Sequence, residues 1–174
     1  MGVMTNDVRR VLERTPAILR GLIEGAPADA IDFHERDGAW SPTQVLAHLT
    51  DGETTDWMPR LKVMVSSAED RSFTPFDREG GFRRYAGWTS SELLREFEQL
   101  RAANLADVDA MRLTDVDRQR TAVHPELGVV TLSHLLACWS THDLGHIAQV
   151  TRSLVRQRGP GVGPWRKYFS LLSD

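Results

Sequence analysis

Two histidines that lie four residues apart, His142 and His146, occur in the stretch THDLGHIAQV. On a helix, residues at this spacing share one face, with Cβ atoms about 5–6 Å apart, so both imidazoles can reach one metal ion. Gln149 extends the same stripe as a contact for an imidazole or a substrate. The pair alone also fits an ordinary solvated helix face, because two ligands do not make a site.

A third histidine makes a metal site the stronger hypothesis. His48 lies among leucines in the stretch VLAHLTDGE. Alone, a histidine in such surroundings is more often a hydrogen-bonded core residue than a ligand. Together with His142 and His146, it gives three ligands from two helices, which is typical of a catalytic metal site with one open position. We therefore predict His48, His142 and His146 as metal ligands.

The other candidate ligands are weaker. Cys138 lies four residues before His142, so a Cys-His-His set on one helix is an alternative, but we expect this free cysteine to be a small core residue. His134 lies eight residues before His142 and is rotated about 80° from the stripe. His34 and His124 fall in connections, where we expect solvent-facing roles.

Two carboxylates and three aromatic residues are further candidates for the site. Asp51 and Glu53 follow His48 in the sequence and could accept a hydrogen bond from a ligand imidazole. We instead expect both on a solvated helix face. Trp88, Trp165 and Tyr168 could line a pocket, but we expect them to serve packing and assign them no role in the site.

A site of three neutral imidazoles has a defined chemistry. It leaves a divalent ion doubly charged, so the ion can deprotonate a thiol or lower the pKa of water. The activated thiol or water can then attack an electrophile without any protein nucleophile. Imidazole suits zinc, copper, iron and nickel alike, so the ligands do not select one metal.

Four helices are predicted to position these residues. Apolar residues recur at helical spacing from Val8 to Ile23, and the first helix ends near Gly25. Within it, Pro16 predicts either a kink or a fresh start that Thr15 caps.

The other three helices have clear start signals. The second begins at Ser41 with an S-x-x-Q capping box, bends at Pro59 and ends near Ser66. The third follows a similar box that begins at Thr89. The fourth begins near Thr131, and the Gly- and Pro-rich segment 159–164 ends it.

Long connections separate the later helices. Segments 67–88 and 113–130 exceed the usual bundle loop of about 2–8 residues and could cover one end of a bundle. They leave the relative direction of neighbouring helices open. No segment shows convincing strand alternation. We therefore predict one all-α domain over residues 1–174, a four-helix bundle with essentially no sheet.

Composition excludes several classes of function. The 174 residues are 41% hydrophobic and 26% charged, and their net charge of −3 without a basic block disfavours nucleic acid or an anionic membrane as partner. One cysteine excludes an internal disulfide. No signal peptide or apolar span of about 20 residues is recognisable, so we expect a cytoplasmic protein. The expected partners are a small-molecule substrate and a second copy in a homodimer.

Several stretches resemble the DinB-like (DinB/YfiT-like) superfamily of metal-dependent enzymes. They are WSPTQVLAHLTDGE, TSSELLREFEQLR and HPELGVVTLSHLLACWSTHDLGHIAQV, and the resemblance extends from RTPAILRGLIEG to GPWRKYFSLL. The most specific part is the H-x-x-x-H-x-x-Q run combined with the upstream W-S and histidine.

The resemblance implies a four-helix bundle with a three-histidine metal site. The matching ligands are His48, His142 and His146, and the implied metal is zinc or nickel. Characterised relatives include a maleylpyruvate isomerase and S-transferases that use bacillithiol or mycothiol. We therefore expect a metal-dependent transferase that activates a low-molecular-weight thiol or water. The alternatives are a metal-dependent hydrolase and a non-catalytic scaffold that the metal stabilises.

Overall fold

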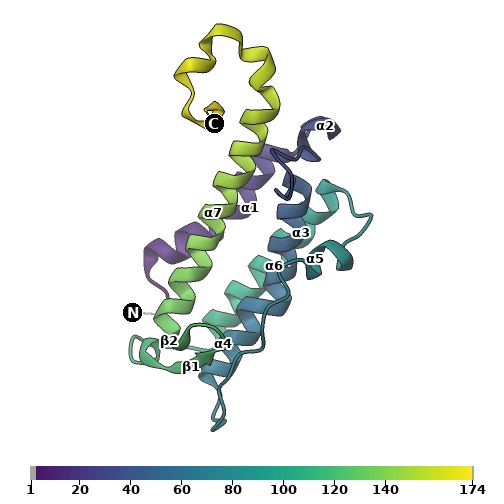
Figure 1. Cartoon of the computed structure of the whole chain (residues 1–174). Helices are drawn as coiled ribbons and strands as arrows, with labels where there is room; N and C mark the ends of the chain where they lie inside the picture. Colours follow the sequence, from purple (N-terminus) through teal and green to yellow (C-terminus); the bar gives the residue numbers. More distant parts are fainter. Residues whose placement is uncertain (1–2, 174) are drawn as a thin grey trace.

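The computed structural model describes residues 3–173, and its long helices form a four-helix bundle (Figure 1). The long helices are α1 Asn6–Ile23, α3 Pro42–Gly52 with its continuation α4 Met58–Val65, α6 Ser90–Ala110 and α7 Leu132–Arg158. The connections carry the short helices α2 Ala28–Ile31 and α5 Gly80–Arg84, the strands β1 Thr121–His124 and β2 Gly128–Thr131, and a 3-10 turn at Asp117–Gln119. Further 3-10 turns, Gly159–Tyr168 and Ser170–Leu172, follow α7.

Helix direction explains why one connection is so long. Helices α1 and α7 run in one direction, and α3–α4 and α6 run in the other (Figure 1). The backbone N–H of Val3, just before α1, donates to the carbonyl of Leu113, just after α6, as this antiparallel arrangement requires. Because α3–α4 and α6 are parallel, the chain between them must return along the bundle. Residues 66–89 make this return and pass the face that carries His48.

The predicted helix starts are confirmed. The Ser41 hydroxyl accepts from the backbone of Gln44 at 3.3 Å, and the Gln44 side chain accepts from the Ser41 N–H at 3.0 Å. Thr89 and Glu92 form the same reciprocal box. A third capping box begins α7, where Thr131 and His134 form the two reciprocal hydrogen bonds. His134 therefore caps this helix.

Helix α1 continues through Pro16 as one helix, so the predicted fresh start is wrong. The Thr15 hydroxyl donates back to the Val11 carbonyl at 2.9 Å instead of capping a new helix. Proline has no N–H, and the carbonyl four residues earlier, that of Leu12, therefore lacks its usual helical donor. Arg101 of α6 supplies the replacement, with Nη1 2.9 Å from that oxygen.

The second helix is interrupted earlier than predicted. A π-helical turn at Glu53–Trp57 separates α3 from α4, and Pro59 lies in the first turn of α4, where its missing N–H is not needed. The extra residue in a π turn changes the phase of the helix. Glu53 and Trp57, at the two ends of this turn, are both buried, at 1% and 3% exposure.

The prediction of essentially no sheet needs one correction, because β1 and β2 form an antiparallel hairpin at one end of the bundle (Figure 1). Each strand has four residues, which is too short to show a clear alternation in the sequence. Gly128 adopts φ 71° at the turn, a conformation that favours glycine. Residues outside the hairpin also support it, since the Phe73 N–H donates to the Val123 carbonyl at 2.9 Å.

The hydrophobic core consists of two clusters along the bundle. One is built around Trp57 and Trp139, whose rings stack at 5.7 Å between centroids. The other is built around Leu19, Leu46 and Phe97. Within residues 3–173, no helix is long and apolar enough to cross a membrane.

Candidate metal centre

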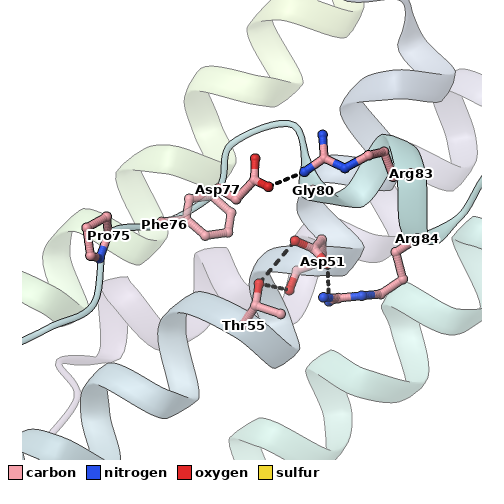
Figure 2. A pocket seen from close by; sticks show the side chains of 8 residues that line it. All are labelled: Asp51, Thr55, Pro75, Phe76, Asp77, Gly80, Arg83 and Arg84. Atoms are coloured by element: carbon pink, nitrogen blue, oxygen red, sulfur yellow. Dashed lines mark hydrogen bonds and ion pairs between the residues drawn. The ribbon is translucent and has the colours of Figure 1, made fainter.

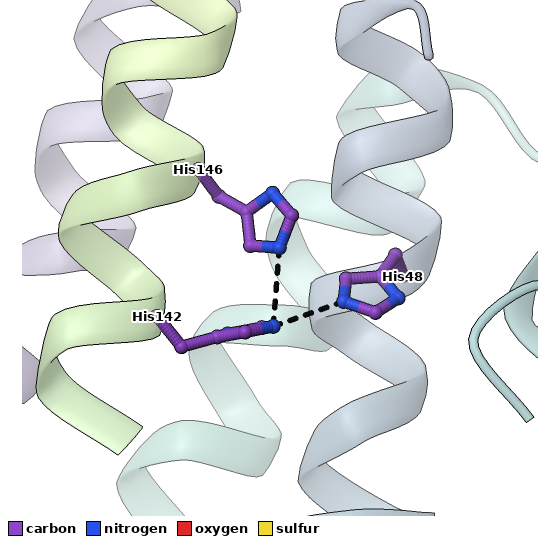
Figure 3. Close-up of side chains that lie close together, drawn as sticks. All are labelled: His48, His142 and His146. Atoms are coloured by element: carbon purple, nitrogen blue, oxygen red, sulfur yellow. Dashed lines mark hydrogen bonds between the residues drawn. The ribbon is translucent and has the colours of Figure 1, made fainter. Parts of the chain in front are cut away.

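His48 of α3 and His142 and His146 of α7 meet between the two helices (Figure 3). The Nε2 atom of His142 lies 3.0 Å from Nε2 of His48 and 3.1 Å from Nε2 of His146. One ligand atom from each ring lies within 4.8 Å of the other two. The imidazole of His48 thus meets those of His142 and His146, although His48 and His142 are 94 positions apart in the chain.

The outer nitrogens fix two of the rings. Nδ1 of His48 lies 2.9 Å from the carbonyl oxygen of Arg78, and Nδ1 of His146 lies 2.9 Å from Oε1 of Gln149. Both partners are acceptors, so each Nδ1 carries the proton and each Nε2 presents a lone pair to the cluster. Gln149 occupies the position along the histidine stripe that the sequence predicted for it.

The inner nitrogens are suited to a cation. Nε2 of His142 can donate to only one of its two neighbours, and its buried Nδ1 has no hydrogen-bond partner among residues 3–173. A tetrahedral ion with Zn–N distances of about 2.0–2.1 Å requires Nε2 atoms about 3.4 Å apart. The observed separations of 3.0, 3.1 and at most 4.8 Å bracket this value. The three side chains therefore fit a divalent metal ion.

Aromatic rings surround the histidines. Trp40 is stacked on His146, with centroids 6.1 Å apart and planes at 8°, and its ring lies 4.8 Å from that of His48. The edge of Trp57 meets His142 at 5.1 Å. Phe76 lies 5.6 Å from His48 on the side of the long connection. These contacts limit the ways in which the imidazoles can turn away from the shared point.

Burial keeps the three imidazoles neutral. Loss of solvation, followed by repulsion from His146, lowers the pKa of His48 to about 4. Burial and repulsion from the other two histidines lower the pKa of His142 to about 2. Burial also lowers the pKa of His146. Neutral imidazole is the form that binds metal, so the site is ready for an ion near pH 7.

Two cavities flank the cluster. One, of about 350 Å³, reaches His146 and Gln149 and is also lined by Trp40 and Arg78. The other, of about 510 Å³, is lined by Asp51 and Thr55 of the second helix and by six residues of the long connection and α5 (Figure 2): Pro75, Phe76, Asp77, Gly80, Arg83 and Arg84. The first cavity gives solvent and small molecules access to His146.

Asp51 and Glu53 do not lie on a solvated helix face, so that prediction is wrong. They are 2% and 1% exposed. Asp51 pairs with Arg84 and accepts from the Thr55 hydroxyl (Figure 2). The hydrogen bonds of both carboxylates go to other groups, so neither accepts from a ligand imidazole. The Arg78 carbonyl and the Gln149 amide take that role instead.

Glu53 belongs to a buried ion cluster beside the histidines. Arg101 holds Glu53 at 2.8 Å and Asp143 at 2.6 Å, and all three side chains are 2% exposed or less. Trp139 donates to Glu53 at 3.2 Å. Together with the Leu12 carbonyl, these bonds join α1, α6, α7 and the π-helical turn. They explain why Asp143, next to His142 in sequence, faces away from the metal centre.

The remaining predicted candidates lie outside the cluster. Cys138 is exposed, so the predicted core role is wrong, and it is not part of the group that the three histidines form. Of the two histidines in connections, His34 is exposed as expected, whereas His124 is half-buried in β1, where its Nδ1 accepts from two backbone N–H groups.

The three aromatic residues assigned to packing are exposed: Trp88 at 40%, Trp165 at 67% and Tyr168 at 72%. Of the aromatic residues that do surround the cluster, Trp57 comes from the π-helical turn, whereas Trp40 and Phe76 come from connections. No helical period marks the latter two in the sequence.

Comparisons with known proteins place the chain in a family. The sequence model of the DinB superfamily matches residues 11–150, a range that contains all three histidines. YfiT of Bacillus subtilis, named as a candidate metal-dependent hydrolase, is 30% identical over 156 residues, which cover 86% of this chain and 83% of YfiT. A protein of Oceanobacillus iheyensis with the same description is 23% identical over 150 residues, which cover 86% of this chain and 85% of that protein.

A solved structure extends the agreement to three dimensions. The structure of YfiT from Bacillus subtilis is described as having an unusual four-helix bundle topology. It superposes with a TM-score of 0.73 and 25% identity, and the match covers 90% of each chain. With the family match over most of its length, this chain belongs to the DinB superfamily.

Proposed function

We propose that His48, His142 and His146 hold one divalent metal ion and that the chain is a metal-dependent enzyme acting on a small molecule. The observation that carries the proposal is the convergence of three Nε2 atoms. In His48 and His146, a hydrogen bond from Nδ1 to an acceptor holds the ring so that Nε2 points to the shared position. Relatives named as candidate metal-dependent hydrolases support a metal. Imidazole ligands favour zinc or nickel over magnesium or calcium.

The residues define the chemistry available to such an ion. An ion held by three neutral imidazoles retains its double charge and lowers the pKa of a thiol or water in its open position. The protein binds and orients: the Arg78 carbonyl and Gln149 hold two ligands, and Trp40 restricts the rings. The cavity beside His146 admits the substrate.

Within this class, we propose transfer of a low-molecular-weight thiol to a small electrophile. A thiol bound to a dication needs no protein base to become a nucleophile. This suits the site, because Asp51 pairs with Arg84 and Glu53 with Arg101. Hydrolysis is the second candidate. The names of the relatives favour it, and the exposed Glu79 in the cavity beside His146 is the carboxylate that would serve as its base.

A purely structural metal is the contrasting function. Structural zinc sites are closed by four protein ligands, commonly with cysteine, whereas catalytic sites keep three ligands and an open position. Here the ligand group contains three histidines, and a cavity of about 350 Å³ reaches one of them. Three ligands beside a cavity favour an enzyme.

Metal analysis combined with an activity screen tests the proposal. Purified protein, stripped with a chelator and reloaded with zinc or nickel, should hold about one ion per chain. The loaded protein is then assayed with low-molecular-weight thiols and an alkylating electrophile, and separately with esters and amides without thiol. Thiol-dependent product that requires the metal supports the transferase. Thiol-independent hydrolysis that Glu79→Gln abolishes supports the hydrolase.

Variants link the ion to the histidines. His142→Ala and His146→Ala should each lower metal affinity by more than about 100-fold, beyond the usual effect of losing a residue that only orients a ligand. His34→Ala is the matched control, because it removes an exposed histidine outside the cluster. Full occupancy in a His142/His146 double variant would refute the site. A bound ion without metal-dependent turnover in either assay would favour the scaffold.

A further inference from the structure

Arg78 contributes to the site in two ways. Its backbone carbonyl accepts from Nδ1 of His48. Its side chain lies over Trp40, with the guanidinium carbon 5.9 Å from the ring centroid, and Trp40 is in turn stacked on His146. Arg78 and Trp40 both line the cavity that reaches His146 and Gln149.

The charge of Arg78 is not neutralised by the protein. Three arginines and two glutamates line this cavity. Arg152 and Glu35 pair with each other at 2.9 Å, and Glu35 is 5% exposed. Within residues 3–173, Arg78 and Arg36 form no ion pair. Glu79 is an exposed carboxylate in the same cavity, but its hydrogen bonds and ion pairs do not include Arg78 either.

Arg78 also lies close to the metal cluster. Its carbonyl oxygen is 2.9 Å from Nδ1 of His48, and its guanidinium lies over Trp40, which is stacked on His146. The protein thus places a free cation beside three neutral ligands that are suited to a further cation. Like charges this close repel, and the arrangement leaves an excess of positive charge that an anion would balance.

We propose that Arg78 binds a carboxylate of the substrate and thereby directs the reactive end of that molecule toward the metal position beside His146. This inference rests on the proposed function and names the substrate class: a small electrophile or thiol that carries a carboxylate. A guanidinium holds a carboxylate through two parallel N–H···O bonds, which fix direction as well as position. The cavity volume of about 350 Å³ suits a small molecule.

The dual use of Arg78 makes a clean test possible. Any substitution retains the backbone carbonyl that orients His48, so Arg78→Gln removes the charge while keeping this hydrogen bond. Arg78→Lys retains the charge but not the planar fork. Arg95→Gln is the matched control, because it removes one exposed positive charge from α6, outside this cavity.

The experiment compares two probes on protein loaded with cobalt, which reports thiolate binding through its absorption bands. The probes are 3-mercaptopropionate and 3-mercaptopropionamide, which share the thiol and differ in the carboxylate. For each variant, the two dissociation constants are measured by titration, and their ratio gives the preference for the acid. Cobalt affinity is measured separately in the absence of thiol.

We expect the wild-type protein and Arg95→Gln to prefer the acid by about five- to tenfold, as for one charge-assisted contact in a solvent-open cavity. Arg78→Gln should bring the ratio close to one, and Arg78→Lys should give an intermediate value. Cobalt affinity should change little in all three variants.

Two results would overturn the inference, and they differ from failure of the proposed function. An equal preference for acid and amide in wild-type protein would show that no cation selects the carboxylate. If Arg78→Gln retains the preference for the acid, that preference arises from chelation of the metal by the carboxylate or from Arg36, and not from Arg78. Failure of wild-type protein to bind cobalt, seen in the thiol-free titration, would instead refute the metal site and the inference that rests on it.

Discussion

Gly81 of α5 lies directly against the backbone of Ala47 in α3, one residue before His48. A Cβ atom at position 81 would lie 2.5 Å from the Ala47 carbonyl oxygen and 2.9 Å from Cβ of Asp51, and Cβ atoms in proteins essentially never approach other atoms this closely. Only glycine allows α5 to sit this close. This contact anchors the segment that presents the Arg78 carbonyl to His48 at 2.9 Å.

The first prediction is that Gly81→Ala weakens metal binding without touching a ligand. The added methyl group must push α5 away from α3, and the Arg78 carbonyl should move from Nδ1 of His48. Loss of such an orienting partner typically lowers metal affinity by about 10–100-fold. A competitive chelator titration of zinc measures the effect. Gly21→Ala is the control, since a Cβ there has no neighbour within 4 Å. Equal affinities for the two variants would contradict the coupling.

The histidines and helix starts could be predicted because their signals are local. Capping boxes span four residues, as Ser41 and Gln44 show, and the His142–His146 spacing is read within one helix turn. His48 has no such local link to His142 and His146, because it lies among leucines on a different helix. It was predicted as a ligand because a third histidine would complete a three-ligand metal site.

The errors have physical causes that the local pattern does not reveal. Glu53 is buried because Arg101, 48 residues away in the chain, supplies its counter-charge inside the bundle, and no local pattern around Glu53 records that partner. Cys138 lies eight residues before His146 and is rotated from it by about 80° on the helix. Its thiol is exposed, like the neighbouring Ala137.

The contacts that orient the site were hidden for a different reason. Arg78 and Trp40 lie in connections, and Arg78 is 30 residues from the histidine that it orients. Only the path of the long connection along the bundle brings them together. Arg101 did leave a signal, since it occupies an apolar stripe between Phe97 and Leu105 at four-residue spacing. A charged residue in such a stripe indicates a buried partner.

The second prediction concerns this buried arginine. Arg101→Met would leave Glu53 and Asp143 buried next to each other without a counter-charge, and breaking a buried pair in this way costs about 3–5 kcal/mol. Urea unfolding measures the loss. Arg9→Met is the control, because the Arg9–Asp109 pair is exposed and should contribute at most about 1 kcal/mol. A similar small loss for both variants would show that the buried cluster does not stabilise the bundle.

The third prediction is that the metal-free protein loses stability as the pH falls below about 6.5, the ordinary pKa of histidine. The folded-state pKa of His48 is lowered to about 4 and that of His142 to about 2, mainly by burial. Between the unfolded and folded pKa values, the unfolded chain binds protons that the folded chain excludes. Each pH unit in this window therefore costs up to about 1.4 kcal/mol per histidine.

Urea unfolding of chelator-treated protein between about pH 7.5 and 5 tests this dependence. His48→Gln removes one of the groups that are forced to stay neutral, so its stability should fall less steeply than that of the wild type. His34→Gln serves as the control for loss of a histidine outside the cluster. Parallel curves for wild type and His48→Gln would contradict the assignment of the acid sensitivity to the buried cluster.

The last prediction asks whether the two helices share one metal centre. If His48 and His146 bind the same ion, His48→Ala should lower zinc affinity about as much as His146→Ala, and the double variant should lose much less than the sum of the two. Removal of either ligand already disables the shared site, and the Nε2 atom of His142 contacts both partners at 3.0 and 3.1 Å. Cys138→Ser should retain wild-type affinity, because the thiol is exposed and outside the cluster. Additive losses in the double variant would mean two independent sites, and loss of zinc in Cys138→Ser with retention in His48→Ala would place the ion on α7 alone.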